Sequence, residues 1–473
     1  MDGQPGSTIL ARSLSAGEPN FDRPDQRRQR MSSAPRVMKR CEYVLHRPAK
    51  LFVRTLRICI VGVWPSEARQ DRDDQPEARY RRRIVDDELD ELLAGLPAVT
   101  IDGPKAVGKT ATALRRAATV YRLDNDAERS IVEAEPSRLL DGKRQILIDE
   151  WQRFPESFDR VRRAVDDGAA AGSFLMTGSA SPSDPPTHSG AGRIVRVRLR
   201  PMTLAERGVV EPTVSLARLL QGEQASITGR SEISLSNYVD EILRSGFPGI
   251  HDLSPRLARA QLDGYLERIV DRDFDALGHQ VRRPATLRRW MQAYAAATAT
   301  TASFETIRDA ASGERREKPT RATTQPYRDV LERLWILDPV PAWLPTRNRL
   351  ARLSSPAKHH LADPALAAQL LEVDADALLH ARPAGPPIPR DGTLLGALFE
   401  SLVTLCVRVY AQAAEARIGH LRTWSGDREV DLIVERGAQL LGIEVKLSQA
   451  STTTTSAISY GCATRSARTS PTP

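Results

Sequence analysis

Short apolar runs that alternate with helical patterns organise the chain from Tyr80 onward. Before the first run, apolar residues recur at helical spacing at Ile84, Leu89, Leu92 and Leu93, which predicts an amphipathic helix. Four apolar runs then predict strands, over residues 98–101, 119–123, 146–149 and 173–179. Strands that alternate with helices are typical of a parallel sheet with helices on both faces.

The pattern after the fourth run changes from strands to helices. Residues 193–201 alternate arginine with aliphatic side chains, which predicts a half-exposed strand. Helical spacing then predicts helices over residues 238–277, 286–297, 304–311, 327–334 and 394–410. Two short strands, over residues 429–434 and 440–446, are predicted on either side of a turn at Gly437.

Both ends of the chain lack such periodicity. Residues 1–77 are rich in Arg, Pro, Ser, Gln and Asp and are expected to be disordered or to lie outside the fold. After Ser448 the chain becomes a low-complexity run of Ser, Thr, Arg and Pro. We therefore expect residues 451–473 to be a disordered tail, and the domain before it to be truncated or frameshifted.

Composition narrows the class of protein. The chain is 41% hydrophobic and only 5% aromatic, which predicts a globular protein rich in Ala, Leu and Val. No apolar run approaches the roughly 20 residues that span a bilayer, and the N-terminus has no signal-peptide pattern, so we expect a cytoplasmic location and no membrane partner. Four widely separated cysteines imply neither disulfides nor a zinc site. The formal charge of +8 is compatible with a nucleic-acid partner but is weak evidence for one.

The chemistry of the chain centres on the stretch from Gly103 to Thr110. It reads GxxxxGK[ST] and lies between a predicted strand and a predicted helix, as a phosphate loop requires. Lys109 would neutralise the β- and γ-phosphates of ATP, and the Thr110 hydroxyl would bind Mg²⁺. The residues predicted to bind the nucleotide here are Gly103, Pro104, Lys105, Ala106, Val107, Gly108, Lys109 and Thr110.

A second motif follows about 40 residues later. Residues 146–150 form an apolar run that ends in two carboxylates, as a Walker B strand does. Asp149 would hold the Mg²⁺ through water, and Glu150 would polarise the attacking water. At the end of the next strand, Thr177 or Ser179 could sense the γ-phosphate, although an ordinary strand-end turn explains either residue equally well.

The order of five motifs resembles a known family: GPKAVGKT, ILIDEWQRFP, FLMTGSAS, HSGAGRIVRVRLRPMTLAE and SGFPG. It is similar to the prokaryotic AAA-type ATPases whose C-terminal part is called DUF4143, over roughly residues 78 to 450. The resemblance implies an α/β P-loop NTPase of the AAA type, with a parallel sheet, a helical lid, a winged-helix segment and a small α/β domain similar to restriction endonucleases of the PD-(D/E)xK class. It also implies a homo-oligomer.

The resemblance sets the expected domains and one further site residue. The domains are a non-core extension (1–77), an AAA-type ATPase core (78–210), a helical lid (211–280), a winged-helix-like segment (281–385), an incomplete nuclease-like domain (386–450) and a tail (451–473). By the same similarity Arg193 is a candidate arginine finger or sensor. An arginine on an exposed strand is the alternative.

Basic residues in the winged-helix-like segment could contact DNA phosphates. They are Arg308, Arg315, Arg316, Lys318, Arg321 and Arg328. Carboxylates are interspersed among them, so a domain that merely packs in an oligomer remains the alternative.

The C-terminal motif matches the PD-(D/E)xK pattern through Glu400, Asp431, Glu444 and Lys446. Asp431 and Glu444 would bind Mg²⁺ or Mn²⁺, and Lys446, two residues along the same strand, would steady the water nucleophile. Asp431, Glu444 and Lys446 are therefore candidate catalytic residues of DNA cleavage. An alternating hairpin could produce the same string by accident, and similarity of fold does not guarantee cleavage.

Three functions follow from these motifs. The favoured one is an AAA-type ATPase that hydrolyses ATP with Mg²⁺ as a molecular switch in an oligomer. The first alternative is a DNA-binding protein, which could also cleave DNA, with the ATPase as its regulator. The second is a non-hydrolytic scaffold whose assembly depends on bound ATP.

Overall fold

The computed structural model describes residues 53–59, 80–179, 190–209, 211–222, 233–312, 318–344, 350, 355–380, 393–422 and 429–447. The predicted tail 451–473, most of the predicted extension 1–77, and Arg315 and Arg316 lie outside the described residues.

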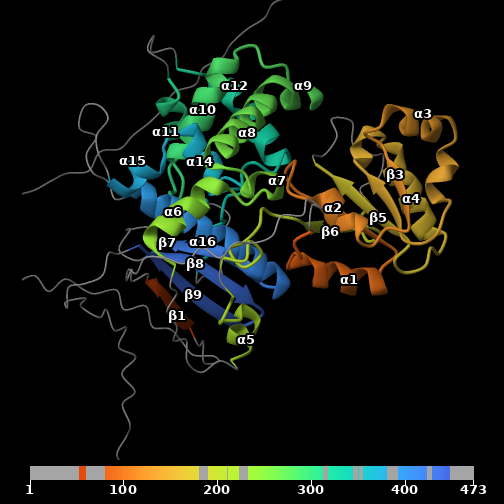
Figure 1. Cartoon of the computed structure of the whole chain (residues 1–473), viewed down its shortest axis with the longest axis horizontal. Helices are drawn as coiled ribbons and strands as arrows, with labels where there is room; N and C mark the ends of the chain where they lie inside the picture. The colour runs from red at the N-terminus through yellow and green to blue at the C-terminus, as the bar shows by residue number, and fades with distance from the viewer. Residues whose placement is uncertain are drawn as a thin grey trace, which may run out of the picture. The chain divides into compact units, whose positions relative to one another are not determined.

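A five-stranded parallel sheet carries the phosphate loop (Figure 1). Its strands are β2 (Ala98–Asp102), β3 (Thr119–Arg122), β4 (Ile146–Asp149), β5 (Phe174–Gly178) and β6 (Val195–Arg198), in the order β3-β4-β5-β2-β6. All its pairings are parallel, which confirms the predicted α/β sheet. The carboxyl ends of β2 and β4 therefore meet at one edge, where ligands of such sheets bind.

Helices cover both faces of this sheet. The covering elements are α1 (Val85–Gly95), α2 (Lys109–Leu114), α3 (Asp126–Ala134), η1 (Pro136–Leu140), η2 (Trp151–Arg153) and α4 (Glu156–Asp166). Leu147 of β4 packs in one core with Leu89 of α1, whereas its neighbour Ile148 packs in a second core with Val161 of α4. Because successive strand residues point to opposite faces, β4 needs apolar residues at consecutive positions, as at residues 146–148 before Asp149.

The middle of the chain is helical. Its elements are α5 (Leu216–Gln221), α6 (Leu235–Arg244), α7 (Pro248–His251), α8 (Pro255–Arg268), the π-helical turn η3 (Ile269–Asp273), α9 (Phe274–Ala276), α10 (Pro284–Ala296), α11 (Phe304–Ala310), α12 (Arg321–Arg333), α14 (Pro364–Leu370) and α15 (Ala375–His380). Helix α14 packs against α6, α8 and α10. The predicted lid and winged-helix-like segments therefore share one core, and the boundary between them stays a prediction.

A second sheet lies near the C-terminal end of the described chain. Helix α16 (Thr393–Ala413) precedes β7 (Arg417–Arg422), β8 (Glu429–Arg436) and β9 (Gln439–Lys446), which pair antiparallel. The predicted helix and the two predicted strands are all present.

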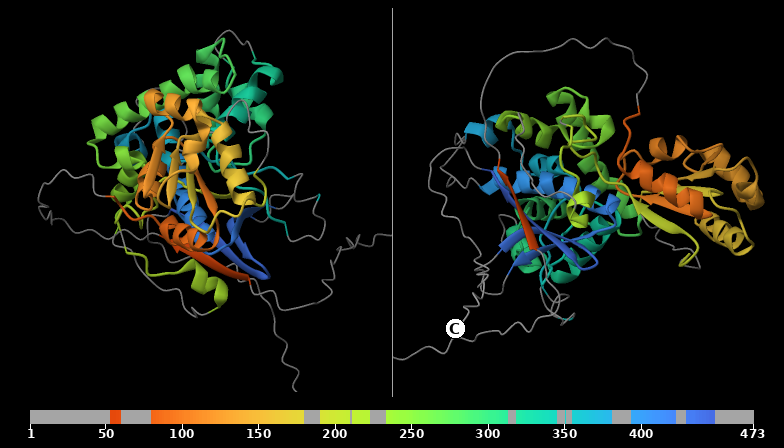
Figure 2. Two further views of the ribbon diagram at one scale, coloured as in Figure 1. Left: turned by 90° about the vertical axis from the view of Figure 1, so that its right-hand side faces the viewer. Right: turned by 90° about the horizontal axis from the view of Figure 1, so that it is seen from below.

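The N-terminal segment contributes one strand to this second sheet. Strand β1 (Val53–Cys59) pairs parallel with β9 along its whole length (Figures 1 and 2). The prediction that residues 1–77 lie outside the fold is therefore wrong for these seven residues. The edge of β9 needs partners for its N–H and C=O groups, and β1 supplies them. The sequence gives no sign of this pairing, because the two strands lie almost 400 residues apart in the chain.

The prediction that no apolar run could span a membrane needs correction at α16. By length and composition alone, residues Leu394–Ala413 are long and apolar enough to cross a membrane. However, 67% of this apolar stretch is buried within the structure. The apolar length of α16 reflects contacts with helices α5, α6 and α14 and with strands β7, β8 and β9.

Candidate functional site

The phosphate loop runs between the end of β2 and the start of α2. A Cβ atom on Gly103 would lie 2.2 Å from the carbonyl oxygen of Leu199, so no larger residue fits there. Gly108, which caps α2, has a φ of 101°, a conformation that glycine adopts without strain. Both glycines of the motif are thus required by backbone geometry.

Lys109 is buried beneath this loop. Its side-chain Nζ donates to the carbonyl oxygens of Gly103, at 3.0 Å, and Pro104, at 2.8 Å. The residue is 4% exposed, and burial lowers the pKa of its ammonium to about 8, an effect that Glu150 and other nearby carboxylates oppose. The loop therefore holds a desolvated positive charge among backbone groups, which favours a bound anion.

Two hydroxyl groups hold Asp149 at the end of β4. Thr110 Oγ1 donates to Asp149 Oδ1 at 2.8 Å, and Thr177 Oγ1 donates to the same oxygen. Burial raises the pKa of Asp149, and these two hydrogen bonds oppose the shift. The structure thus brings together the two residues predicted to hold Mg²⁺, and it places Thr177 on one of them.

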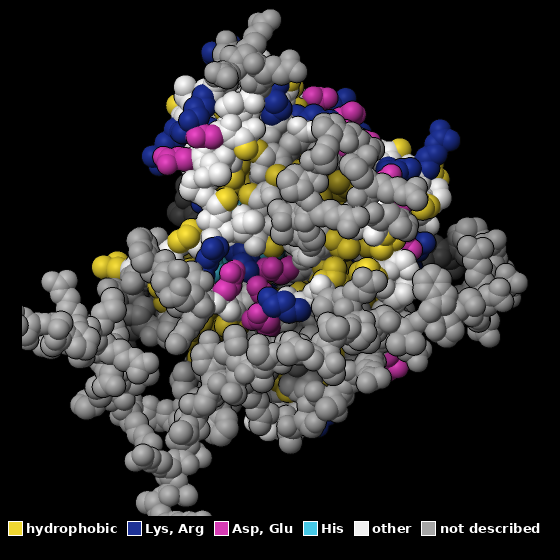
Figure 3. All heavy atoms as spheres, turned by 90° about the vertical axis from the view of Figure 1, so that its left-hand side faces the viewer, with side chains coloured by type: hydrophobic (Ala, Val, Ile, Leu, Met, Phe, Trp, Pro, Cys, Tyr) yellow, Lys and Arg dark blue, Asp and Glu magenta, His cyan; other side chains and the backbone are white. Residues whose placement is uncertain are grey.

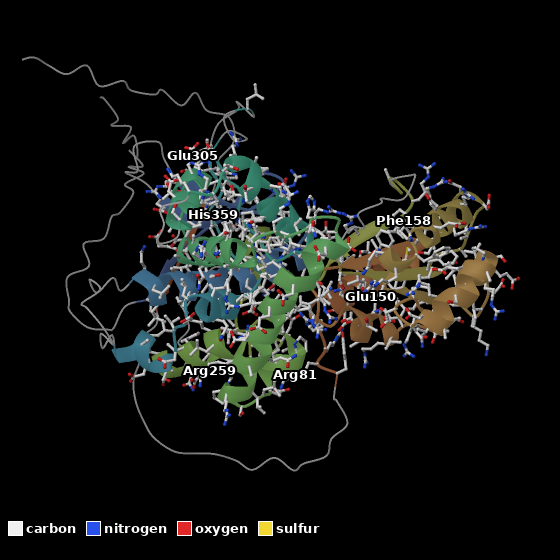
Figure 4. All side chains as sticks on the ribbon, turned by 90° about the horizontal axis from the view of Figure 1, so that it is seen from above. Arg81, Glu150, Phe158, Arg259, Glu305 and His359 are labelled. Atoms are coloured by element: carbon white, nitrogen blue, oxygen red, sulfur yellow. The ribbon has the colours of Figure 1, made fainter. Side chains whose placement is uncertain are left out.

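Glu150 follows directly, in a left-handed conformation with φ of 55°. Such a conformation costs a non-glycine residue roughly 1–3 kcal/mol and is concentrated at functional sites. The carboxylate of Glu150 accepts from Ser179 Oγ at 2.9 Å and from Gln152 Nε2. Ser179, predicted to sense the γ-phosphate, therefore contacts the candidate base in this structure. Figure 4 labels Glu150 in the α/β domain.

Lys105 points to the helical part of the chain. Its Nζ forms a 2.5 Å ion pair with Asp273 Oδ1, and its carbonyl oxygen accepts from the hydroxyl of Tyr265 at 3.3 Å. The phosphate loop therefore contacts α8 and η3, and the predicted role of Lys105 with the nucleotide stays a prediction.

Two buried residues that brace the loop were not identified from sequence. Arg83 Nη1 donates to the carbonyl oxygen of Val107 at 3.0 Å, and its Nε pairs with Glu206 Oε1 at 3.1 Å. Glu206 also accepts from the backbone N–H groups of Ile84, at 2.8 Å, and Thr203, at 2.7 Å. The PMTLAE motif contains Glu206, but no spacing rule connects it to an arginine more than 120 residues earlier.

Arg193 lies away from the groups described so far. Its Nε pairs with Asp166 Oδ1 at 2.8 Å, and its Nη1 donates to the carbonyl oxygen of Ala191 at 3.1 Å. The side chain is 47% exposed. Among its described contacts none is to the phosphate loop of the same chain, so its role as a finger or sensor stays a prediction.

The C-terminal carboxylates surround a lysine. Lys358 Nζ lies 2.8 Å from Glu400 Oε1, 3.2 Å from Asp431 Oδ1 and 3.3 Å from Glu429 Oε1. Its side chain is 1% exposed. The other oxygen of Asp431 accepts from the N–H of Val445 at 2.8 Å. An ammonium group thus lies among three carboxylates, two of which, Glu400 and Asp431, belong to the predicted motif.

Glu444 and Lys446 lie on β9, beside Asp431 on the neighbouring strand β8. Lys446 Nζ pairs with Glu444 Oε1 at 2.9 Å, and the lysine side chain is 58% exposed. Within the described ranges no group of three or more His, Cys, Asp or Glu side chains is placed to hold a metal ion. The carboxylates of both strands and of α16 are ion-paired with Lys358 or Lys446 in this structure. The metal and catalytic roles of Asp431, Glu444 and Lys446 stay predictions. The face shown in Figure 3 has acidic and basic side chains side by side near its centre.

Most of the described basic residues in the winged-helix-like segment already have partners. Lys318 and Arg308 both pair with Asp309, at 2.7 and 3.4 Å, and Arg328 pairs with Glu332 at 2.8 Å. Lys318 also lines an open cavity of about 1330 Å³ with Arg282, Arg283 and Arg289. DNA contact here stays a prediction.

Comparisons with known proteins assign three segments of the chain. Residues 96–207 match an AAA domain, residues 235–377 match a domain of unknown function called DUF8612, and residues 395–467 match the domain of unknown function DUF4143. The first match covers both nucleotide motifs. The second spans the predicted boundary at residues 280 and 281, and the third continues past the predicted boundary at residue 450.

Two mycobacterial proteins are similar over most of the chain. Uncharacterized proteins of Mycobacterium tuberculosis (strain ATCC 25618 / H37Rv) and Mycobacterium bovis (strain ATCC BAA-935 / AF2122/97) are each 28% identical to it over 402 residues. These residues are 82% of this chain and 80% of each relative. Among solved structures, a Walker-type ATPase of Pyrococcus abyssi is 14% identical, with a TM-score of 0.36, and covers 63% of this chain and 99% of its own.

Proposed function

Because the chain belongs to the P-loop ATPases that combine an AAA domain with a DUF4143 domain, we propose that it hydrolyses ATP with Mg²⁺ and acts as a molecular switch. One observation carries the proposal. The hydroxyl of Thr110 and the carboxylate of Asp149 are joined at 2.8 Å beside the buried ammonium of Lys109. A phosphate anion and a divalent cation need these groups in one place.

The side chains present fit both ligands. Lys109 has two carbonyl oxygens as its hydrogen-bond acceptors, so its charge remains available to phosphate oxygens. Hydroxyl and carboxylate oxygens such as those of Thr110 and Asp149 are the ligands that Mg²⁺ prefers. When bound, Mg²⁺ would neutralise charge on the β- and γ-phosphates.

The proposed reaction assigns one role to each remaining polar group. Glu150 accepts a proton from water, whose oxygen then bonds to the γ-phosphorus while the bond to the β–γ bridging oxygen breaks, which yields ADP and phosphate. The hydroxyl of Ser179, at 2.9 Å, orients the Glu150 carboxylate. The hydroxyl of Thr177 holds Asp149 in place.

Replacement of the candidate base tests this reaction. Glu150→Gln keeps the shape of the side chain but cannot accept the proton, so ATP binding should persist while turnover falls by ~10² or more. Glu133→Gln is the matched control, because Glu133 is a half-exposed carboxylate of α3 paired with Arg129 at 3.4 Å. Wild-type turnover by Glu150→Gln would remove Glu150 from this role.

We further propose that Arg193 acts on the nucleotide of a neighbouring copy in an oligomer. Among the described residues, its half-exposed guanidinium contacts the exposed groups Asp166 and Ala191 of its own chain, and an added positive charge stabilises the phosphoryl-transfer transition state. Mixing Arg193→Ala with Lys109→Ala protein should restore part of the ATPase activity that each lacks alone. Absence of any restoration by co-expressed variants would contradict action between copies.

A further inference from the structure

Three guanidinium groups share one carboxylate between β6 and α16. Arg198 Nη1 and Arg200 Nε lie 3.0 Å from the two oxygens of Asp338, and Arg408 Nη1 donates to one of the same oxygens. The side chains of Asp338 and Arg408 are buried, and that of Arg200 is nearly so. Three guanidinium groups face one carboxylate, so this cluster has an excess of positive charge. Burial of charges is costly unless each is paired.

The surrounding carboxylates do not remove this excess. Glu88, which faces the same space, accepts a hydrogen bond from Gln412 Nε2 at 2.8 Å, and burial raises its pKa. Asp102 is paired with another arginine, Arg196, at 2.7 Å. Even with Glu88 ionised, two carboxylates face the three guanidinium groups of the cluster.

Two N–H donors of the cluster are also unsatisfied. The Nε atoms of Arg198 and Arg408 are buried and have no hydrogen-bond partner among the described residues. The guanidinium of Arg198 stacks on the ring of Trp335 at 4.6 Å, which fixes its plane. A buried donor without an acceptor costs about 1–3 kcal/mol.

These groups line an open cavity of about 370 Å³. Arg196, Arg198, Arg200 and Arg408 lie on its wall, together with Glu88 and Gln412. The remaining lining residues, Ala411, Ala416 and Ile418, lie between the end of α16 and the start of β7 and are small or apolar. The volume falls within the range of small-molecule sites, and an arginine-rich wall is typical of phosphate recognition.

We propose that this cavity binds a small phosphorylated molecule, whose phosphate group balances the excess positive charge of the arginine cluster. The site is separate from the phosphate loop, and its existence does not depend on ATP hydrolysis. The shared chemistry of its ligands is a phosphate dianion, supplied either as inorganic phosphate or as the phosphate of a nucleotide.

The segment directly after β6, Leu199 and Arg200, connects this cavity to the nucleotide site. The N–H of Leu199 donates to the carbonyl oxygen of Asp102 at 2.8 Å, directly before the phosphate loop. The carbonyl oxygen of Arg200 accepts from Arg83 Nη2 at 2.6 Å, and Arg83 also donates to Val107 of the loop. If the proposed ATPase function holds, a ligand in the cavity will change the KM for ATP, because it acts on the segment after β6 that supports the loop.

Titration calorimetry on full-length Lys109→Ala protein tests the arginine-lined cavity. In this variant the phosphate loop lacks its ammonium group, so binding there does not interfere. We expect saturable binding of inorganic phosphate and a loss of about tenfold or more in affinity when Arg200→Gln is added. Arg200→Lys keeps the charge but not the guanidinium geometry, so its loss of affinity should be smaller than that of Arg200→Gln. Arg160→Gln, at an exposed pair on α4, is the matched control. No saturable binding, or equal binding by Arg200→Gln, overturns the proposal.

A second variant covers the case in which Arg200→Gln does not fold. Gln412→Glu leaves every arginine in place but adds a carboxylate 3.1 Å from Arg200 Nη1, so it should compete with phosphate and lower its affinity. Unchanged affinity in this variant also overturns the proposal. A parallel titration with AMP separates the two sources: tighter binding of AMP than of phosphate identifies a nucleotide, and equal binding identifies phosphate itself.

Discussion

The hydroxyl of Thr110 lies 2.8 Å from the carboxylate of Asp149, so the first turn of α2 and the end of β4 meet at one point. The two residues are 39 positions apart in the chain. Strand order explains the contact, because β4 and β2 are both neighbours of β5 in a parallel sheet. Two motifs that are separate in sequence therefore form one site.

Loss of the buried ammonium should abolish nucleotide binding. In Lys109→Ala the phosphate charge has no compensating ammonium, and we expect a loss of at least ~2 kcal/mol in ATP binding. Lys143→Ala is the control, because Lys143 is exposed and lies in the loop before β4. Calorimetry with ATP measures both variants, and unchanged affinity of Lys109→Ala would refute the phosphate-loop assignment.

Acid should weaken the fold through Asp338. Its pKa is lowered well below the usual range by Arg198, Arg408 and Arg200, against the opposing effect of burial. A carboxylate with a lowered folded-state pKa stabilises the fold above its unfolded-state pKa of about 4, and this contribution is lost as pH falls towards the folded-state value. Asp338→Asn should therefore unfold more easily at pH 7 and show a flatter loss of stability below pH ~4.

Urea unfolding at several pH values measures this effect. Asp309→Asn provides the control, because Asp309 pairs with Lys318 at the surface. If Asp338→Asn and the wild type lose stability in parallel below pH ~4, Asp338 does not carry the acid dependence.

Local patterns predicted many of the elements, whereas contacts between distant segments could not be predicted from them. The apolar run 146–149 and the carboxylates after it predicted β4 and the Walker B position, and β4 is present at those residues. By contrast, Lys358 enters the carboxylate cluster from a segment without any motif. Its role depends on the antiparallel bridge between Val340 and Lys358, a tertiary contact that has no periodic signal in sequence.

Removal of the buried lysine should destabilise the C-terminal part of the chain. Lys358→Met leaves three carboxylates without their shared cation, and breaking a buried ion pair costs about 3–5 kcal/mol. Lys446→Met is the matched control, because its pair with Glu444 is exposed and such pairs contribute about 0–1 kcal/mol. Urea unfolding distinguishes the two, and equal small losses would mean that Lys358 is not the central cation.

The same cluster leads to a prediction about DNA cleavage. A metal-dependent nuclease needs its cation between the carboxylates and its second layer of contacts held rigid. Here Lys358 occupies that position, and Lys446 is paired with Glu444 on the strand beside Asp431. We therefore expect weak or absent cleavage of plasmid DNA by this chain with Mg²⁺ or Mn²⁺. Robust cleavage that disappears in Lys446→Ala would show that Asp431, Glu444 and Lys446 do act as a nuclease site, with Lys358 displaced when the metal binds.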